Sequence, residues 1–228
     1  MTKTRLYDFI IAGAGAAGLS LLWHILHTPE LNKKNILLID NSFKTLDEKT
    51  WCFWNKDVIH FPHLIRKSWN QITVKSRDCT FSQSNGNFSY HCIKASEFRR
   101  SILDFAIDFK NVELVEADIQ SIETINNQAV LTTTTDSYWG DWCFQSIFHA
   151  YEKQQPIKPV LQHFMGYLIE AEEKIFDPNS MVMMDFQESA SNNYGTHFFY
   201  VLPYSENKAL IEYTIFSDTL LNESDYKA

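Results

Sequence analysis

The sequence lacks any pair of cysteines at metal-binding or redox spacing. Its four cysteines are far apart, and its eight histidines are scattered without a spacing typical of a zinc site. We therefore expect no bound metal, and four reduced thiols as in a cytoplasmic protein. The G-x-S-x-G motif and the Walker-type phosphate loop are also missing from the chain, so neither hydrolase nor nucleoside-triphosphatase chemistry is favoured.

Blocks of like charge are absent as well. The 228 residues include 20 basic and 28 acidic side chains, for a formal net charge of −8. Binding to a phosphate backbone needs clustered basic side chains, so we expect no nucleic-acid partner. One long apolar run occurs, at residues 9–26, but three glycines inside it argue against a signal peptide or a membrane span. Membrane contact is thus expected to be peripheral.

What the chain does have at its beginning is a β-α-β pattern. Residues 6–12 are predicted as a buried strand, residues 15–27 as a helix, and residues 35–40 as a second buried strand. A G-x-G-x-x-G motif joins the first strand to the helix. This context makes the motif a predicted dinucleotide-binding site.

Each part of this motif has a physical role in binding a dinucleotide. Gly13 permits the tight turn, Ala14 and Gly15 let the backbone approach a pyrophosphate, and Gly18 allows the helix to pack closely on the strand. The helix N-terminus supplies N–H donors to the anion. Asp40 ends the second strand and is placed to accept hydrogen bonds from ribose hydroxyls, which favours FAD or NAD over NADP.

A second helix is predicted over residues 96–109, with Ser96 as its N-cap. Arg99 lies one turn inside this helix. In a flavoprotein of this layout we expect its planar guanidinium to contact the dinucleotide phosphates. A solvent-facing position on the helix is an alternative of equal weight.

The rest of the chain is predicted to be mostly β-structure. Residues 41–70 show no clear period and are interpreted as a long loop with short pieces of regular structure. Strands are expected at residues 71–75, 90–93, 112–116, 119–123, 129–134, 142–148, 162–170, 181–186, 197–203 and 208–216, with a helix beginning at residue 218. The four strands within residues 112–148 are interpreted as a β-meander, and the last four as a second, antiparallel sheet.

These elements predict an α/β fold with two domains. Residues 1–153 are expected to form a three-layer FAD/NAD(P)-binding Rossmann-like domain with a β-meander, partly interrupted by a loop and strand region near residues 50–93. Residues 154–228 are expected to begin an antiparallel β-sheet domain that binds substrate. Two prolines within residues 154–159 mark the expected crossing between the domains.

Two acidic residues of the second sheet are catalytic candidates. Glu212 lies in a strand whose neighbours are apolar or able to hydrogen-bond, and burial there would raise its pKa and keep it protonated as an acid. Asp185 lies in a similar apolar strand, so it too could be a buried, protonated acid. For both, the alternative is a solvent-facing carboxylate on an antiparallel sheet.

With these residues in view, the chain resembles the flavin-dependent lycopene β-cyclase family of carotenoid biosynthesis. The similar segments follow one another in a consistent order, at residues 7–18, 49–54 (KTWCFW), 144–146 (FQS), 162–167 (QHFMGY), 184–186 (MDF), 199–203 (FYVLP) and 210–214 (LIEYT). Many family members have Glu-Glu-Thr where this chain has Glu212-Tyr213-Thr214, so the resemblance implies the acid role for Glu212 but not a two-carboxylate arrangement. Family members continue to a second glycine-rich flavin segment, so we expect this chain to be a truncated, N-terminal portion of a cyclase.

The resemblance implies an isomerase that converts acyclic lycopene end groups to β-ionone rings without net oxidation or reduction. A protonated Glu212 would start the cyclisation, while reduced FAD, with NAD(P)H as reductant, would stabilise the cation. The implied substrate is lycopene or a related acyclic carotenoid, and the implied location is the cytoplasm, peripheral to the inner face of the membrane. The alternatives are a flavin-dependent monooxygenase or prenyl reductase of the same architecture, or an inactive truncated nucleotide-binding fragment.

Overall fold

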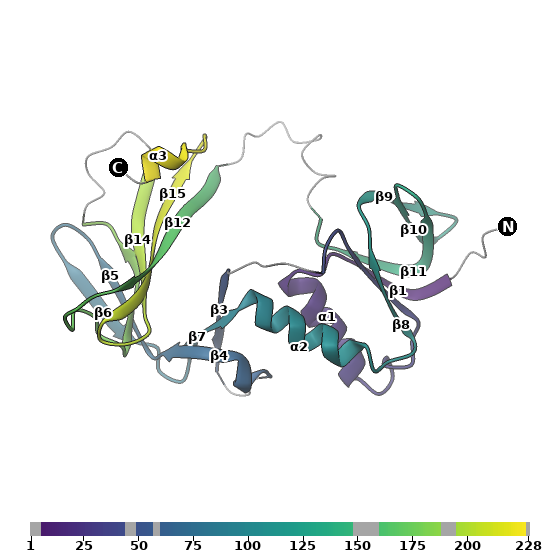
Figure 1. Ribbon diagram of the computed structural model, residues 1–228, viewed down its shortest axis with the longest axis horizontal. Coiled ribbons are helices and arrows are strands. Elements are labelled where there is room, and N and C mark those ends of the chain that lie inside the picture. The colour runs from purple at the N-terminus through teal and green to yellow at the C-terminus, as the bar shows by residue number, and fades with distance from the viewer. Residues whose placement is uncertain (1–5, 44–48, 57–59, 148–159, 188–194, 227–228) are drawn as a thin grey trace. The chain divides into compact units, whose positions relative to one another are not determined.

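The computed structural model describes residues 6–43, 49–56, 60–147, 160–187 and 195–226 (Figure 1). The chain divides into two compact units. The first unit comprises residues 1–51 and 94–155, and the second comprises residues 52–93 and 156–228. A six-stranded sheet lies in each of them.

The sheet of the first unit has the strand order β8-β2-β1-β11-β10-β9. Its strands are β1 (Leu6–Ala12), β2 (Ile36–Asp40), β8 (Val112–Glu116), β9 (Ile119–Ile125), β10 (Gln128–Thr133) and β11 (Ser137–Gln145). The strands β8, β2, β1 and β11 are parallel, whereas β10 and β9 continue the sheet in antiparallel fashion. This arrangement is the predicted Rossmann-like sheet with a meander at one edge.

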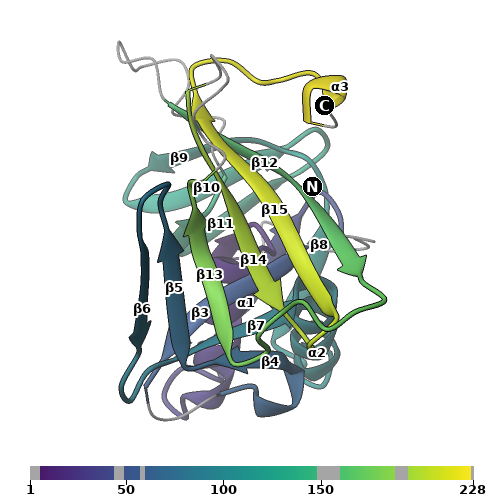
Figure 2. The same ribbon diagram turned by 90° about the vertical axis from the view of Figure 1, so that its left-hand side faces the viewer.

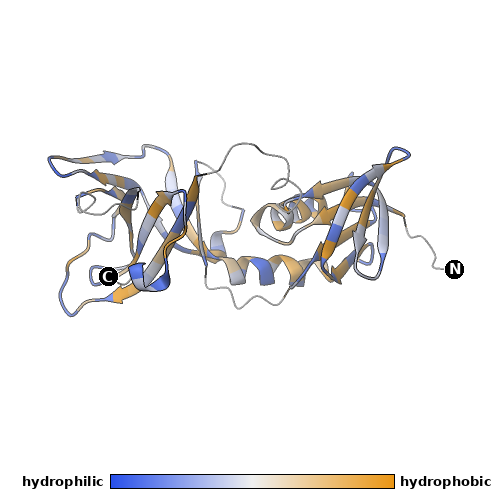
Figure 3. Ribbon diagram, turned by 90° about the horizontal axis from the view of Figure 1, so that it is seen from above, coloured by the Kyte–Doolittle hydropathy of each residue, from blue (hydrophilic) through white to orange (hydrophobic). Residues whose placement is uncertain are grey.

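Continuous apolar sequence explains the centre of this sheet. The first four residues of β2 are fully buried, as expected for a parallel strand that is covered on both faces. Two helices, α1 (Ala16–His27) and α2 (Ala95–Ala106), pack side by side in this unit (Figure 1). Hydrophilic and hydrophobic residues alternate along α2 (Figure 3), and its buried residues Phe98 and Ile102 recur at helical spacing.

The sheet of the second unit has the order β12-β15-β14-β13-β5-β6 (Figure 2). Its strands are β5 (Gln71–Lys75), β6 (Thr80–Ser84), β12 (Leu161–Glu170), β13 (Ser180–Asp185), β14 (Thr196–Pro203) and β15 (Lys208–Ser217). All neighbours are antiparallel except β13 and β5, which are parallel. Trp69 is the largest fully buried side chain of this unit, and its indole N–H donates to the Pro203 carbonyl at 2.9 Å.

Where a long loop was predicted, the structure has strands. Two of them, β3 (Thr50–Asn55) and β4 (Ile65–Trp69), lie within residues 41–70, and a short 3-10 helix, η1 (Pro62–Leu64), precedes β4. They form a three-stranded sheet of order β3-β7-β4 with β7 (Ser89–Lys94), which agrees with the strand predicted at residues 90–93. The sequence of β3 does not alternate between apolar and polar residues, so its pattern gave no strand signal. Besides its pairing with β7, ring contacts stabilise β3: the ring centroids of Trp54 and Tyr90 are 4.5 Å apart, and those of Phe53 and His91 are 5.4 Å apart.

Several boundaries also differ from the predictions. The strand β8 pairs with β2 and is not part of the meander. The helix α2 begins at Ala95, with Lys94 as its N-cap in place of Ser96, and ends at Ala106. The terminal helix α3 (Glu223–Tyr226) is a single turn. The expected domain crossing at residues 154–159 lies outside the described residues.

The division into units also differs from the linear division of the sequence. Residues 52–93 group with the second unit, because β5 pairs with β13 and extends that sheet through β6. Within the described parts of the chain, no helix has both the length and the hydrophobicity needed to cross a membrane. All four cysteines are free.

Candidate functional site

The turn between β1 and α1 requires glycine at two positions. Gly13 has a φ of +106°, and a Cβ there would lie 2.5 Å from the Ser146 hydroxyl oxygen. A Cβ on Gly18 would lie 1.9 Å from the Gly13 carbonyl oxygen, which no side chain can tolerate. Gly15 differs from both, because a Cβ there would meet nothing within 4 Å. Its backbone therefore faces open space, as the approach of a ligand requires.

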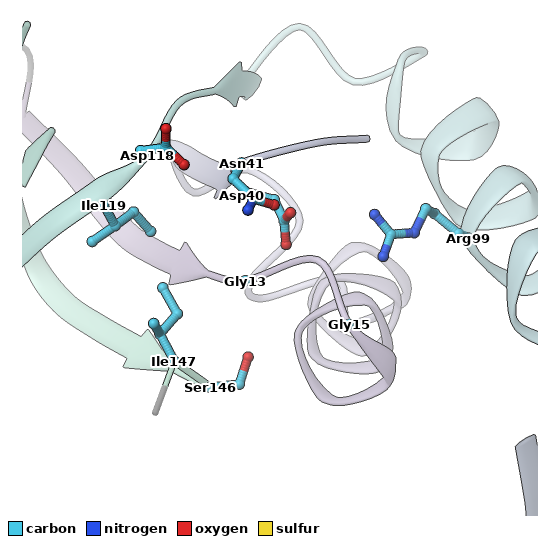
Figure 4. A pocket seen from close by; sticks show the side chains of 9 residues that line it. All are labelled: Gly13, Gly15, Asp40, Asn41, Arg99, Asp118, Ile119, Ser146 and Ile147. Carbon is cyan, nitrogen blue, oxygen red and sulfur yellow. The ribbon is translucent and has the colours of Figure 1, made fainter. Parts of the chain in front are cut away.

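A cavity of about 340 Å³ opens beside this turn (Figure 4). It is lined by Gly13, Gly15, Asp40, Asn41, Arg99, Asp118, Ile119, Ser146 and Ile147, all of which belong to the first unit. The structure thus brings together three features that the sequence predicted separately, namely the glycine turn, the carboxylate after β2 and the arginine of α2.

Arg99 and Asp40 are both tied to the backbone around the cavity. The Arg99 guanidinium donates to the Ser42 carbonyl at 2.7 Å and points from α2 toward the turn (Figure 4). The Asp40 carboxylate accepts from the backbone N–H of Ala14 at 2.5 Å and from that of Ser42 at 3.1 Å. The Ala14 amide is therefore directed at Asp40, and Asp40 also fixes the turn.

The beginning of α1 suits an anion. Gly15 is the N-cap and provides no side-chain cap, and the first turn contains no acidic residue. The first N–H groups of α1 and the positive end of its dipole are thus available to a phosphate. Together with Arg99 and Asp40, these groups fit the pyrophosphate and ribose of a dinucleotide.

Asp118, Asn41 and Ser146 also line the cavity, and sequence reasoning missed them. Asn41 and Ser146 each follow the carboxyl end of a parallel strand, β2 or β11, which is where open α/β sheets bind ligands. That rule would have identified Ser146 if the parallel pairing of β11 with β1 had been recognised. Asp118 lies in the short connection between β8 and β9, and no sequence signal marks it.

In the second unit, Glu212 is in the middle of β15, between two other strands. It pairs with Gly166 of β12 on one side and with Tyr200 of β14 on the other. Burial raises the pKa of the Glu212 carboxyl above its ordinary value of 4.5. This shift favours the protonated form, as the sequence predicted for an acid.

Neutral polar groups lie near this carboxyl. The Tyr200 hydroxyl donates to the Tyr90 hydroxyl at 2.8 Å, and both residues also interact with the Cys52 thiol. Burial is the main cause that raises the pKa of both Cys52 and Tyr90 to about 12 and moves that of Tyr200 upward as well. All three groups are therefore uncharged at neutral pH, and sequence reasoning did not single them out.

Asp185 lies elsewhere, at the end of β13. Its carboxylate forms an ion pair with Lys75 at 3.1 Å and accepts from the backbone N–H of Gln187 at 3.1 Å. Asp185 pairs with Phe199, the neighbour of Tyr200 in β14, so it is on the opposite face of the sheet from Glu212. The structure does not bring the two candidate acids together. The described residues also contain no group of side chains that could hold a metal ion.

Comparison with protein families now identifies the chain more closely. The family described as "Lycopene cyclase protein" matches residues 8–228. The chain belongs to this family. Two plant relatives are lycopene beta cyclases, the chloroplastic enzyme of Nicotiana tabacum and the chloroplastic/chromoplastic enzyme of Capsicum annuum. Each is 23% identical over 230 residues, covering 93% of this chain but 44% of the relative. The chain thus spans under half the length of these members of the lycopene cyclase family.

Solved structures show that this family member has the fold of FAD-dependent, Rossmann-type flavoproteins. A geranylgeranyl bacteriochlorophyll reductase-like protein of Thermoplasma acidophilum superimposes with a TM-score of 0.65 at 11% identity, covering 99% of this chain and 60% of that one. The halogenase PltM in complex with phloroglucinol and FAD superimposes with a TM-score of 0.61 at 11% identity, covering 97% and 55%. The predicted α/β fold class is confirmed.

Proposed function

We propose that this chain carries the cofactor-binding and acid-bearing parts of a lycopene β-cyclase. The reaction would convert acyclic end groups of lycopene or a related carotenoid to β-ionone rings. The observation that carries the proposal is the half-buried Glu212 carboxyl, whose pKa is raised by partial burial and whose described neighbours include neutral hydroxyl and thiol groups. Membership of the lycopene cyclase family supports it.

We propose FAD as the resident cofactor. The glycine turn, the N-terminus of α1, Asp40 and Arg99 would hold its adenosine and pyrophosphate part in the cavity of the first unit. When bound in its reduced form, FAD would supply negative charge near a cationic intermediate of the carotenoid, and NAD(P)H would be the reductant. The similar fold of the halogenase PltM, solved in complex with FAD, supports this assignment.

The proposed role of Glu212 is that of a general acid. Its carboxyl gives a proton to the terminal double bond of the carotenoid, and the next alkene attacks the resulting carbocation to close the ring. Transfer of one ring proton to the Glu212 carboxylate leaves the cyclohexene and restores the acid, so protons balance and no electrons are gained or lost. Exclusion of water protects the cation, and the apolar neighbours of Glu212, such as Leu210, suit that requirement.

The proposed substrate also suggests a cellular location for the protein. A carotenoid is an apolar polyene that dissolves in lipid and not in water. We therefore propose a cytoplasmic protein that contacts the inner face of the membrane peripherally to take up its substrate.

The test is the conversion of lycopene in a carotenoid-producing host that expresses the full reading frame. We expect Glu212→Gln to lower ring formation by at least about a hundredfold, the scale of general acid catalysis, while flavin content is retained. Glu206→Gln is the matched control, since this glutamate side chain is 52% exposed. Substantial cyclisation by Glu212→Gln would refute the acid assignment.

The variant Asp185→Asn tests whether Asp185, the second predicted catalytic residue, takes part in ring formation. Because this carboxylate is already paired with Lys75 and lies on the other face of the sheet, we expect the variant to retain ring formation. Loss of ring formation with normal protein yield would restore Asp185 as a catalytic candidate.

Product mass separates the cyclase from the other flavoprotein reactions on this fold. A cyclase yields an isomer of lycopene, whereas a prenyl reductase adds hydrogen and a monooxygenase adds oxygen. Purification of the chain itself and measurement of flavin absorbance distinguish a cofactor-binding protein from an inactive nucleotide-binding fragment.

A further inference from the structure

The side chain of Glu212 lies across the backbone of Gly166 in the neighbouring strand. A Cβ on Gly166 would be 2.9 Å from the Glu212 Cγ and 3.4 Å from its Oε1 oxygen. The first distance is shorter than real Cβ contacts, so any larger residue at position 166 would displace the glutamate. Glycine at this position therefore lets the carboxyl lie flat against β12.

The strand β12 is an edge of its sheet (Figure 2). Glycine weakens a strand because it has no side chain to pack and more conformational entropy to lose, and a glycine inside a strand often marks the close approach of another group. Here the group that approaches is the Glu212 carboxyl. The carboxyl consequently reaches toward the open edge of the sheet.

Two apolar side chains flank Gly166 on the same face of β12. Phe164 pairs with Thr214 and Leu168 pairs with Leu210, so both lie on the face that carries Glu212. Phe164 is 54% exposed and Leu168 is 59% exposed. Two large apolar side chains with this exposure, directly beside a half-buried acid on the same face, form a surface that suits an apolar ligand.

We propose that Gly166 is a positioning residue for Glu212 and that Phe164 and Leu168 form the apolar contact for the carotenoid end group beside this carboxyl. The inference rests on the proposed function. A hydrocarbon end group offers no hydrogen-bonding atom, so apolar contact is the means by which a protein can hold it against an acid. Phe164 and Leu168 lie directly beside the proposed proton donor Glu212. We therefore assign the carotenoid polyene as the ligand that contacts them.

The first test measures Gly166→Ala in the purified full-length protein, with lycopene supplied in phosphatidylcholine vesicles. We expect kcat to fall by about tenfold or more, because general acid catalysis depends on the position of the acid. KM should change by less than about twofold, since a displaced proton donor affects the transition state and not uniform binding. The melting temperature should change little, because the gain from replacing a glycine in a strand opposes the cost of displacing the glutamate side chain.

Phe164→Ala and Leu168→Ala test the apolar contact. We expect each to raise KM by about tenfold, the scale of a lost hydrophobic contact in a binding pocket, with a smaller effect on kcat. Tyr167→Ala and Ile169→Ala are matched controls, because these side chains lie on the opposite face of the same strand and are 48% and 39% exposed. The controls should leave KM unchanged.

Three results would overturn the inference. One is an unchanged kcat for Gly166→Ala in a protein whose wild type cyclises lycopene. Another is equal effects of the variants on the two faces of β12. The last is a lower melting temperature without a change in KM for Phe164→Ala and Leu168→Ala, which would mean that protein covers these residues. A wild type that forms no ring would refute the proposed function, and this inference with it.

Discussion

The Glu212 carboxyl binds its proton more tightly in the folded chain than in the unfolded chain, because burial raises its pKa above 4.5. In the pH window above 4.5 and below the raised pKa, the unfolded state has released this proton while the folded state retains it. The folded state therefore loses stability as the pH rises through that window. Glutamine has no proton to release and is free of this loss.

We therefore expect the melting temperature of Glu212→Gln, relative to that of the wild type, to increase as the pH is raised from 4 to 7. The measurement is thermal unfolding at a series of pH values. A difference between Glu212→Gln and the wild type that is independent of pH would mean that the carboxyl is not shifted as described.

The hydrogen bond between Tyr200 and Tyr90 yields a second prediction for single residues. Tyr200→Phe removes the hydroxyl that donates to Tyr90 and leaves a part-buried oxygen without that donor. We expect the free energy of unfolding to fall by about 1–2 kcal/mol, as for other lost buried hydrogen bonds. Urea denaturation measures it, with Tyr167→Phe in β12 as a control that should change little, because this side chain is exposed. Equal effects of the two variants would contradict the role of the hydroxyl pair.

The helices and strands that could be predicted are those whose sequence pattern lies within the element itself or in the turns beside it. The strands β1 and β2 and the helix α1 follow from apolar runs and from glycine spacing, and the four last strands follow from short apolar segments bounded by turns. The strand β3 and the placement of β8 beside β2 depend on pairing with distant strands. The strand β5 was predicted at its observed residues, but its place in the sheet was not, because its parallel partner β13 is more than a hundred residues away. Sequence periodicity carries no information on such partners.

At the scale of elements, we predict the effect of a substitution in the turn between β1 and α1. Gly18→Ala places a methyl group against the Gly13 carbonyl, which forces the helix away from the strand. We expect a loss of roughly 3 kcal/mol or more in the free energy of unfolding, as for other overpacked sites. Gly15→Ala is the control, because its methyl group meets nothing within 4 Å. Gly15→Ala should therefore remain as stable as the wild type. If both variants were destabilised equally, the contact with the Gly13 carbonyl would not be the cause.

At the scale of the whole molecule, both units are assembled from two separate stretches of the chain. A division at one sequence position cannot reproduce this arrangement, which is why the linear division assigned residues 50–93 to the first domain. The candidate acid and the dinucleotide cavity also lie in different units. All residues that line the cavity come from the first unit, whereas Glu212, Tyr200, Tyr90 and Cys52 come from the second.

The separation of the two sites predicts that dinucleotide binding depends on the first unit alone. Purified protein titrated with FAD, or with ADP as its adenosine half, should bind both, and binding should be insensitive to Glu212→Gln. Arg99→Ala should weaken both ligands by about tenfold, the equivalent of a lost charge-assisted hydrogen bond. Arg100→Ala is the matched control, because Arg100 is adjacent in α2 and exposed, and does not line the cavity. Both variants remove one positive charge, so equal weakening of ligand binding would indicate a general electrostatic effect. Weaker binding by Arg99→Ala alone would place the phosphates in the cavity that Arg99 shares with the glycine turn before α1.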